Sequence, residues 1–270
     1  MQQIDARACL GSHDVLFVTI DSLRFDVAAN AMAQGQTPNL HAIAPGGVWQ
    51  KRHTSSSFTY GAHTAFFSGF LPTPVEDPAA PRLFATHFPG SRSINGNTLV
   101  FDQSDIVTGF SDAGYRTICV GGVGFFNKRS ALGSVLPGLF QESWWSERFG
   151  VNNLQSTEYQ VGIACDRLKI LKPDQRTFMF INISACHFPN RGYCEGAKHD
   201  TPATQAAALA YADTQLQPLI NAMRSRAPVL TIICSDHGEA YGEDGYTGHR
   251  LGHSTVWDVP YIETILAATG

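Results

Sequence analysis

Two apolar runs in the sequence end in side chains that can bind a metal ion. The run Val15–Ile20 is followed directly by Asp21, and the run Val229–Cys234 is followed, after one serine, by Asp236 and His237. Because α/β enzymes keep their sites at the carboxyl ends of sheet strands, we expect these three side chains to be ligands of a divalent cation. The alternatives are that Asp21 caps a helix and that the second pair belongs to a polar loop.

A third candidate group is a run of hydroxyl side chains, residues 54–57 and Thr59, that precedes an apolar segment expected to be helical at Ala62–Gly69. Backbone N–H groups and the helix dipole at such a start attract an anion, so a hydroxyl there is placed to attack it. A free Ser or Thr hydroxyl is a weak nucleophile, but coordination to a divalent cation activates it without a neighbouring base. A simple Ser/Thr helix cap is the alternative.

Further polar groups lie in loops beyond strand ends. His187 follows the apolar run Thr177–Ile183, while His249, Arg250 and His253 lie in the loop that follows the second metal-binding pair. These side chains could neutralise a bound oxyanion or protonate a leaving group. Surface histidines without a function are the alternative.

Apolar runs of strand length alternate with longer segments of helical character, which is the pattern of a parallel sheet with crossover helices. The sequence therefore predicts an α/β fold. The segment 120–150 combines glycines and aromatic residues with little periodicity, and we expect it to pack against the sheet, with a pocket cover as the alternative. The Pro-rich segment Leu71–Pro81 is expected to be a surface loop. The clearest strands are Val15–Ile20, Thr117–Val120, Thr177–Ile183 and Val229–Cys234, and the clearest helices are Pro38–Ala44, Ala62–Gly69, Ser104–Ala113, Glu158–Leu171 and Thr204–Met223.

Composition limits the class of protein. The 270 residues are 43% hydrophobic and 16% charged, which predicts one folded domain over residues 1–270. The net charge of −4 gives no general field for nucleic acid or anionic membranes, so an anionic ligand needs a local positive site. No basic leader, membrane-length apolar run or CxxC pair is present, and we expect a cytoplasmic protein whose six cysteines are reduced structural thiols.

Taken together, these features resemble the alkaline phosphatase and sulfatase superfamily, over most of the chain and in the family's order. The resemblance implies a three-layer α/β/α sandwich with a central, mostly parallel sheet, and it is closest to small sulfatase-like hydrolases of bacteria. The stretches that carry it are Phe17–Asp26, Thr37–Leu40, Ala113–Thr117, Ser235–Glu239, Gly242-Glu243 and Val259-Pro260.

The resemblance also implies a nucleophile. Counting back from Ser68-Gly69, the family's nucleophile position falls on Thr59. The Cys-x-Pro-Ser-Arg signature from which sulfatases make formylglycine is absent, and the spacing of Thr59 and His63 instead looks like that of the phosphodiesterase branch. This implies phosphate or phosphonate esters as substrates, through a covalent threonine intermediate.

The implied metal site consists of Asp21, Thr59, Asp236 and His237 around one divalent ion, with Zn or Mn as the expected metal. A second metal is not expected, because the loop Ser184–Pro189 is similar to the His-x-Pro of one-metal members. Ser22 stands where sulfatases have the second aspartate of an Asp-Asp pair, which argues against a calcium-type, all-oxygen cage.

The resemblance implies that the remaining polar side chains act on a small anionic ester, contacting its oxygens or protonating its leaving group. Hydrolysis is preferred to transfer. The open alternatives are a sulfatase that works without formylglycine and a catalytically silent anion-binding protein of the same fold, and the oligomeric state is open. The side chains assigned to the substrate are His63, His187, His249 and His253.

Overall fold

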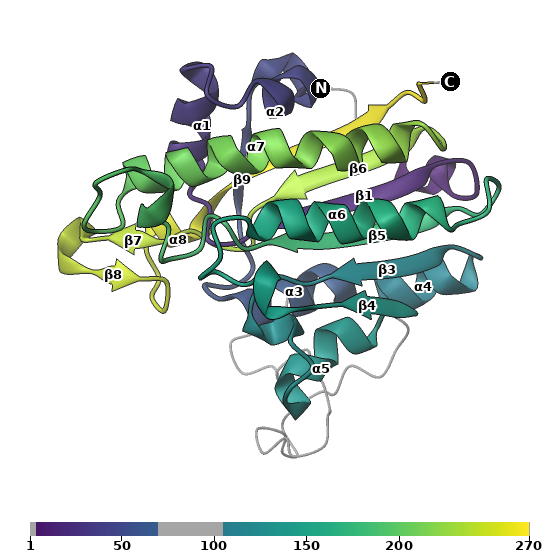
Figure 1. The fold of residues 1–270 in the computed structure, drawn as a ribbon, viewed down its shortest axis with the longest axis horizontal. Coiled ribbons are helices and arrows are strands. Elements are labelled where there is room, and N and C mark those ends of the chain that lie inside the picture. The colour runs from purple at the N-terminus through teal and green to yellow at the C-terminus, as the bar shows by residue number, and fades with distance from the viewer. Residues whose placement is uncertain (1–3, 70–104, 270) are drawn as a thin grey trace, which may run out of the picture.

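The computed structural model describes residues 4–69 and 105–269, and its centre is a seven-stranded sheet in the order β2-β9-β6-β1-β5-β3-β4 (Figure 1). β1, β3, β4, β5 and β6 pair in parallel, whereas β9 is antiparallel to both of its neighbours. The predicted α/β fold with a mostly parallel sheet is confirmed. The strands of this sheet are β1 (Asp14–Ile20), β2 (Gln50–His53), β3 (Arg116–Val120), β4 (Glu142–Trp144), β5 (Thr177–Ile183), β6 (Val229–Cys234) and β9 (Asp258–Leu266), and a separate hairpin pairs β7 (Ala240–Tyr241) with β8 (Thr247–Gly248).

Helices cover both faces of the sheet, and the burial of alternate strand residues explains why. In β5, Met179 and Ile181 face a core shared with the long helices α6 and α7, while Phe178 and Phe180 face a second core that includes Phe67 of α3. A strand buried on both faces reads as one continuous apolar run, as the sequence does here. The described helices are α1 (Phe25–Ala33), α2 (Pro38–Ile43), α3 (Thr59–Ser68), α4 (Ile106–Asp112), α5 (Ala131–Gly138), α6 (Ser156–Lys169), α7 (Pro202–Arg224) and α8 (Ser254–Trp257).

The four predicted strands agree with β1, β3, β5 and β6 to within one residue at each end, and the five predicted helices are all present. One boundary matters for function: α3 begins at Thr59, three residues before the predicted start at Ala62. The loop expected at Leu71–Pro81 lies outside the described residues.

The segment 120–150 forms β4, α5 and short turns of 3-10 helix, and it both packs and encloses. Phe126 and Leu136 are buried in the second core, as expected from packing. Phe125 and Leu132, however, line the large cavity described below, so the alternative of a pocket wall also holds.

The sequence predicts no membrane-spanning segment and six reduced cysteines. Among the described residues, no helix has the length and apolarity needed to span a membrane. All six cysteines are free thiols, and four of them are buried.

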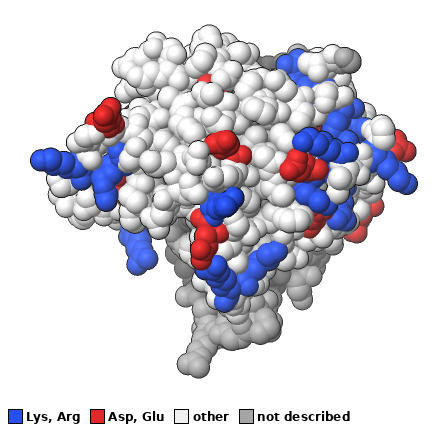
Figure 2. Space-filling model, viewed as in Figure 1, with Lys and Arg blue, Asp and Glu red and all other residues white. Residues whose placement is uncertain are grey.

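On the face formed by α6 and α7, positive and negative side chains lie side by side rather than in a patch of one sign (Figure 2).

Candidate functional site

The expected metal ligands meet where two adjacent parallel strands end. Asp21 follows β1, and Asp236 and His237 follow β6, its neighbour in the sheet. One ligand atom from each of the three residues lies within 4.8 Å of the others, and all three side chains are fully buried. Among the residues that the structure describes, this is the only group of three acidic, His or Cys side chains with such spacing.

Thr59 is the fourth residue of this group, and it comes from a helix rather than from the end of a strand. It is the first residue of α3, and its Oγ1 donates a hydrogen bond to Asp21 Oδ2 at 3.3 Å and lies 3.3 Å from His237 Nε2. Its hydroxyl caps no backbone group of its own helix, because the N-cap position belongs to Phe58. Thr59 therefore points at the ligand group, and the alternative of a simple helix cap is not what the structure has.

The polar atoms of this group fit a divalent cation. Asp236 Oδ2 is buried and has no hydrogen-bond partner, and a buried carboxylate oxygen in that state requires a compensating charge. His237 Nδ1 lies 2.9 Å from the carbonyl oxygen of Gly238 and must donate to it, which leaves the Nε2 lone pair directed towards Asp21, Asp236 and Thr59. Two carboxylates and one neutral imidazole are a donor set that Zn²⁺ and Mn²⁺ accept.

The pKa directions follow the same geometry. Burial, and then the nearby charge of Asp21, raises the pKa of Asp236 well above its usual range. Burial alone would also raise the pKa of Asp21, but the imidazoles of His187, His237 and His63 lower it below the usual value. Burial lowers the pKa of His237, which favours the neutral, metal-binding ring.

Two residues that the sequence analysis did not single out as ligand supports hold the carboxylates in place. Ser22 donates its backbone N–H to Asp236 Oδ1 at 3.2 Å and its hydroxyl to Asp21 Oδ1 at 3.0 Å, from a left-handed backbone with φ 63°. Asn182 donates to Asp21 Oδ2 at 3.3 Å. The sequence pattern distinguishes Asn182, because it is the only amide side chain in the otherwise apolar run of β5.

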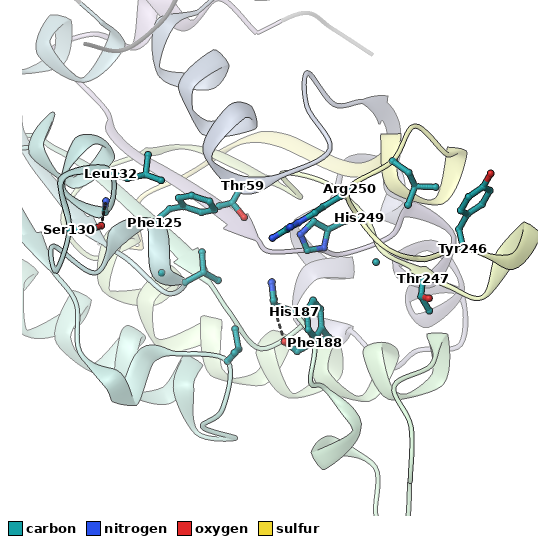
Figure 3. Close-up of a pocket in the computed structure, with 16 residues that line it drawn as sticks. Thr59, Phe125, Ser130, Leu132, His187, Phe188, Tyr246, Thr247, His249 and Arg250 are labelled. Carbon is teal, nitrogen blue, oxygen red and sulfur yellow. Dashed lines mark hydrogen bonds between the residues drawn. The ribbon is translucent and has the colours of Figure 1, made fainter. Parts of the chain in front are cut away.

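A cavity of about 880 Å³ opens beside Thr59 (Figure 3). Its polar lining includes His187, His249 and Arg250, the loop residues that the sequence analysis proposed, and Figure 3 shows these three side chains between Thr59 and Thr247. No Asp or Glu is among the described lining residues. The cavity therefore suits an anionic ligand. The cavity also has an apolar lining, formed by Val123, Phe125, Leu132, Val151, Phe188 and Leu251.

His63 and His253 are not in the positions expected of substrate-binding residues. The His63 ring is fully buried beneath the ligand group, with Nε2 2.9 Å from Thr19 Oγ1 and Nδ1 2.7 Å from the carbonyl oxygen of Thr59. Four phenylalanine rings surround it at centroid distances of 5.3 to 6.1 Å. An α-helix brings residues i and i+4 to one side, so a helix that starts at Thr59 turns His63 inwards with it.

His253 lies at the start of α8, where its Nδ1 accepts a hydrogen bond from the backbone N–H of Thr255. Its Nε2 lies 3.1 Å from Asp244 Oδ2, and it is not among the described residues that line the cavity. The geometry therefore gives His253 a capping role and leaves the substrate side to His187, His249 and Arg250.

Comparisons with known proteins agree with this fold. The C-terminal periplasmic domain of EcEptC from Escherichia coli in complex with Zn is 13% identical, with a TM-score of 0.65, and the match covers 96% of this chain and 73% of that one. The soluble domain of lipooligosaccharide phosphoethanolamine transferase A from Neisseria meningitidis is 15% identical, with a TM-score of 0.65 and coverage of 99% and 80%. The lipoteichoic acid synthase LtaP from Listeria monocytogenes is 12% identical, with a TM-score of 0.59 and coverage of 99% and 69%.

At these identities the solved structures establish the fold, which matches the resemblance noted in the sequence. No curated protein sequence is similar enough to be matched to this chain. A family model does match: the model named Sulfatase covers residues 13–262. The chain therefore belongs to the sulfatase family.

Proposed function

We propose that this chain is a metal-dependent hydrolase of phosphate or phosphonate esters that works through a covalent intermediate on Thr59. The observation that carries the proposal is the position of the Thr59 hydroxyl, which lies 3.3 Å from both Asp21 Oδ2 and His237 Nε2 and lines the cavity. A hydroxyl held against a ligand group and open to a pocket on its other side has the arrangement that nucleophilic attack requires.

Asp21, Asp236, His237 and Thr59 would hold one divalent ion, with Zn or Mn as the metals that suit these donors. When bound, that ion would lower the pKa of the threonine hydroxyl and place a positive charge beside the ester oxygens. The chain contributes the rest. The hydrogen bond from Thr59 Oγ1 to Asp21 Oδ2 fixes the direction of the O–H bond and leaves the oxygen lone pairs free for attack.

The loop residues act on the ester. Arg250 and the imidazoles of His187 and His249 face the same cavity as Thr59 and can bind the non-bridging oxygens, on which charge accumulates during attack. As Thr59 forms its bond to phosphorus, its hydroxyl proton leaves along the hydrogen bond to Asp21 Oδ2, the bond to the leaving alcohol breaks, and a protonated histidine can give a proton to the departing oxygen. Water then attacks phosphorus and releases Thr59 and the phosphate or phosphonate product.

Transfer to an alcohol would use the same intermediate, and a neighbour in fold is named as a phosphoethanolamine transferase. We assign hydrolysis to this chain, and product analysis with and without an added acceptor alcohol separates the two reactions. A transferase would form a new ester in proportion to the alcohol and would turn over slowly in water alone.

The principal experiment incubates Zn- or Mn-loaded protein with a panel of aryl and alkyl phosphate monoesters, diesters and phosphonates, quenches in acid and maps the modified peptide by mass spectrometry. We expect turnover of at least one ester, and one phosphoryl group on Thr59. Modification of another residue, or turnover by Thr59→Ala at the normal rate, would refute the mechanism. Ser57→Ala is the matched control, because it removes a hydroxyl two positions earlier on the entering chain.

Sulfate esters are the second candidate, because the family model that matches the chain is that of the sulfatases. An aryl sulfate tested beside the matching aryl phosphate decides between them. Tight binding of both esters without turnover of either, by protein with its metal bound, would instead favour the catalytically silent anion-binding protein.

A further inference from the structure

Glu239 is a buried carboxylate beside the cavity to which the mechanism above gives no task. It is 3% exposed, and its Oε2 lies 2.7 Å from Nδ1 of His249. A small hairpin creates the contact: Ala240 of β7 pairs with Gly248 of β8, so Glu239 and His249 occupy the next opposed positions. Gly248 has φ 95°, a conformation that side chains rarely adopt, and it turns the chain so that His249 enters the cavity.

This contact decides which nitrogen of His249 carries hydrogen. An ionised carboxylate can only accept a hydrogen bond, so Nδ1 of His249 must be the donor. The other ring nitrogen, Nε2, is then directed away from Glu239. Two further imidazoles lie near the ring: that of His237, with a centroid distance of 4.3 Å, and that of His187, at 5.7 Å.

We propose that Glu239 is a positioning residue that acts on the reaction through His249. It fixes the ring orientation, with Nδ1–H towards Glu239 and Nε2 towards the cavity beside Thr59, where Nε2 binds or protonates an ester oxygen when it carries the ring's second hydrogen. The inference rests on the proposed function, in which His249 binds or protonates the ester. The contact is well defined, since the Glu239 side chain is 3% exposed and its Oε2 lies 2.7 Å from Nδ1 of His249.

The kinetic test is a double-mutant cycle of Glu239→Ala and His249→Ala in the metal-loaded enzyme. We expect Glu239→Ala to lower kcat about 30-fold with KM changed less than about 3-fold, the range for loss of a group that orients a catalytic imidazole. His249→Ala is expected to lower kcat about 100-fold. The double variant should be no slower than His249→Ala, because Glu239 has no effect once its partner is absent.

Glu239→Gln is the conservative variant and should retain kcat within about 5-fold of the wild type, because its carboxamide oxygen still accepts from Nδ1. Asp244→Asn is the matched control: it alters the other carboxylate–histidine pair of this region, with His253, outside the cavity lining, and asparagine tolerates the left-handed backbone of Asp244. Its kcat should stay within about 2-fold of the wild type. Losses that multiply in the double variant would overturn the proposal, as would loss of bound metal in either Glu239 variant.

A second measurement does not depend on turnover. Nitrogen-15 NMR of the imidazoles, with His249 assigned by its absence in His249→Ala, reports which nitrogen is protonated. We expect the Nδ1–H form in the wild type and in Asp244→Asn, and a shift towards the Nε2–H form in Glu239→Ala. An unchanged His249 signal in Glu239→Ala would refute the positioning role even if no ester were turned over, whereas failure of the Thr59 mechanism alone would leave this signal pattern intact.

Discussion

The burial of His63 predicts a specific dependence of stability on pH. Burial lowers the pKa of this imidazole from 6.5 to about 4, against the smaller opposing effects of its bond to the Thr59 carbonyl and the charge of Asp21. Both ring nitrogens already have partners in the neutral form, since Nδ1 donates to that carbonyl and Nε2 accepts from Thr19. The folded protein therefore holds His63 neutral at pH values where the unfolded chain would protonate it.

The sign follows from proton binding. As the pH falls below 6.5, the unfolded chain takes up a proton at this position and the folded protein does not, so the free energy of unfolding decreases. The contribution of His63 is complete above pH 6.5 and is lost between pH 6.5 and about 4. At about 1.36 kcal/mol per pKa unit, this single group should remove about 1.4 kcal/mol of stability between pH 7.5 and 5.5.

The assay is urea unfolding of the wild type and of His63→Gln at several pH values between 7.5 and 5.5, with and without a chelator, so that metal linkage is separated. Other titrating groups cancel in the comparison. We expect the wild type to lose about 1.4 kcal/mol more than the variant over this range. Parallel curves would refute a depressed pKa. A wild type that loses less stability than the variant would mean that His63 is protonated and paired with Asp236, whose Oδ2 lies 3.7 Å from its Nδ1.

Three further predictions address the site. Thr59→Ala should abolish turnover while costing at most about 2 kcal/mol of stability, and Thr59→Ser should retain some activity, whereas Ser57→Ala should be nearly silent; steady-state rates and urea midpoints check this. Purified protein should carry about one divalent ion per chain by elemental analysis, and Asp236→Ala should lose both the ion and activity, while two fully occupied sites would contradict the ligand set. His253→Ala should lower the free energy of unfolding by about 1 kcal/mol through loss of the α8 cap and leave kcat within about 3-fold of the wild type. A loss of kcat near 100-fold would indicate that His253 acts on the substrate.

The strands and the metal ligands were predictable because each depends on a short stretch of sequence. A strand buried on both faces appears as an unbroken apolar run, so β1, β5 and β6 could be located to within a residue. A polar side chain directly after such a run must emerge at the sheet edge where parallel strands end. Asp21, Asp236 and His237 satisfy that rule, and adjacent strands bring them together.

Other features could not be predicted because no periodic pattern in the sequence marks them. β9 has a mixed burial pattern and contains Pro260, so neither an apolar run nor a regular alternation marks it as a strand. It pairs with β6 and β2 because that edge of the sheet is available to it. The contact between Glu239 and His249 depends on a two-residue pairing in the β7–β8 hairpin, which is too short to leave a periodic signal.

The metal ligands are positioned by paired strands, whereas the substrate-side residues come from loops. Metal binding and substrate choice therefore depend on different parts of the fold. The three ligands lie at the ends of β1 and β6, whose parallel register fixes their backbone positions to one another. The substrate-side groups His187, His249 and Arg250 come from loops that no strand pairing fixes at those residues. Substitutions in these loops should therefore change which ester is turned over without releasing the metal, whereas any change that shifts β1 against β6 should disrupt metal binding first and activity with it.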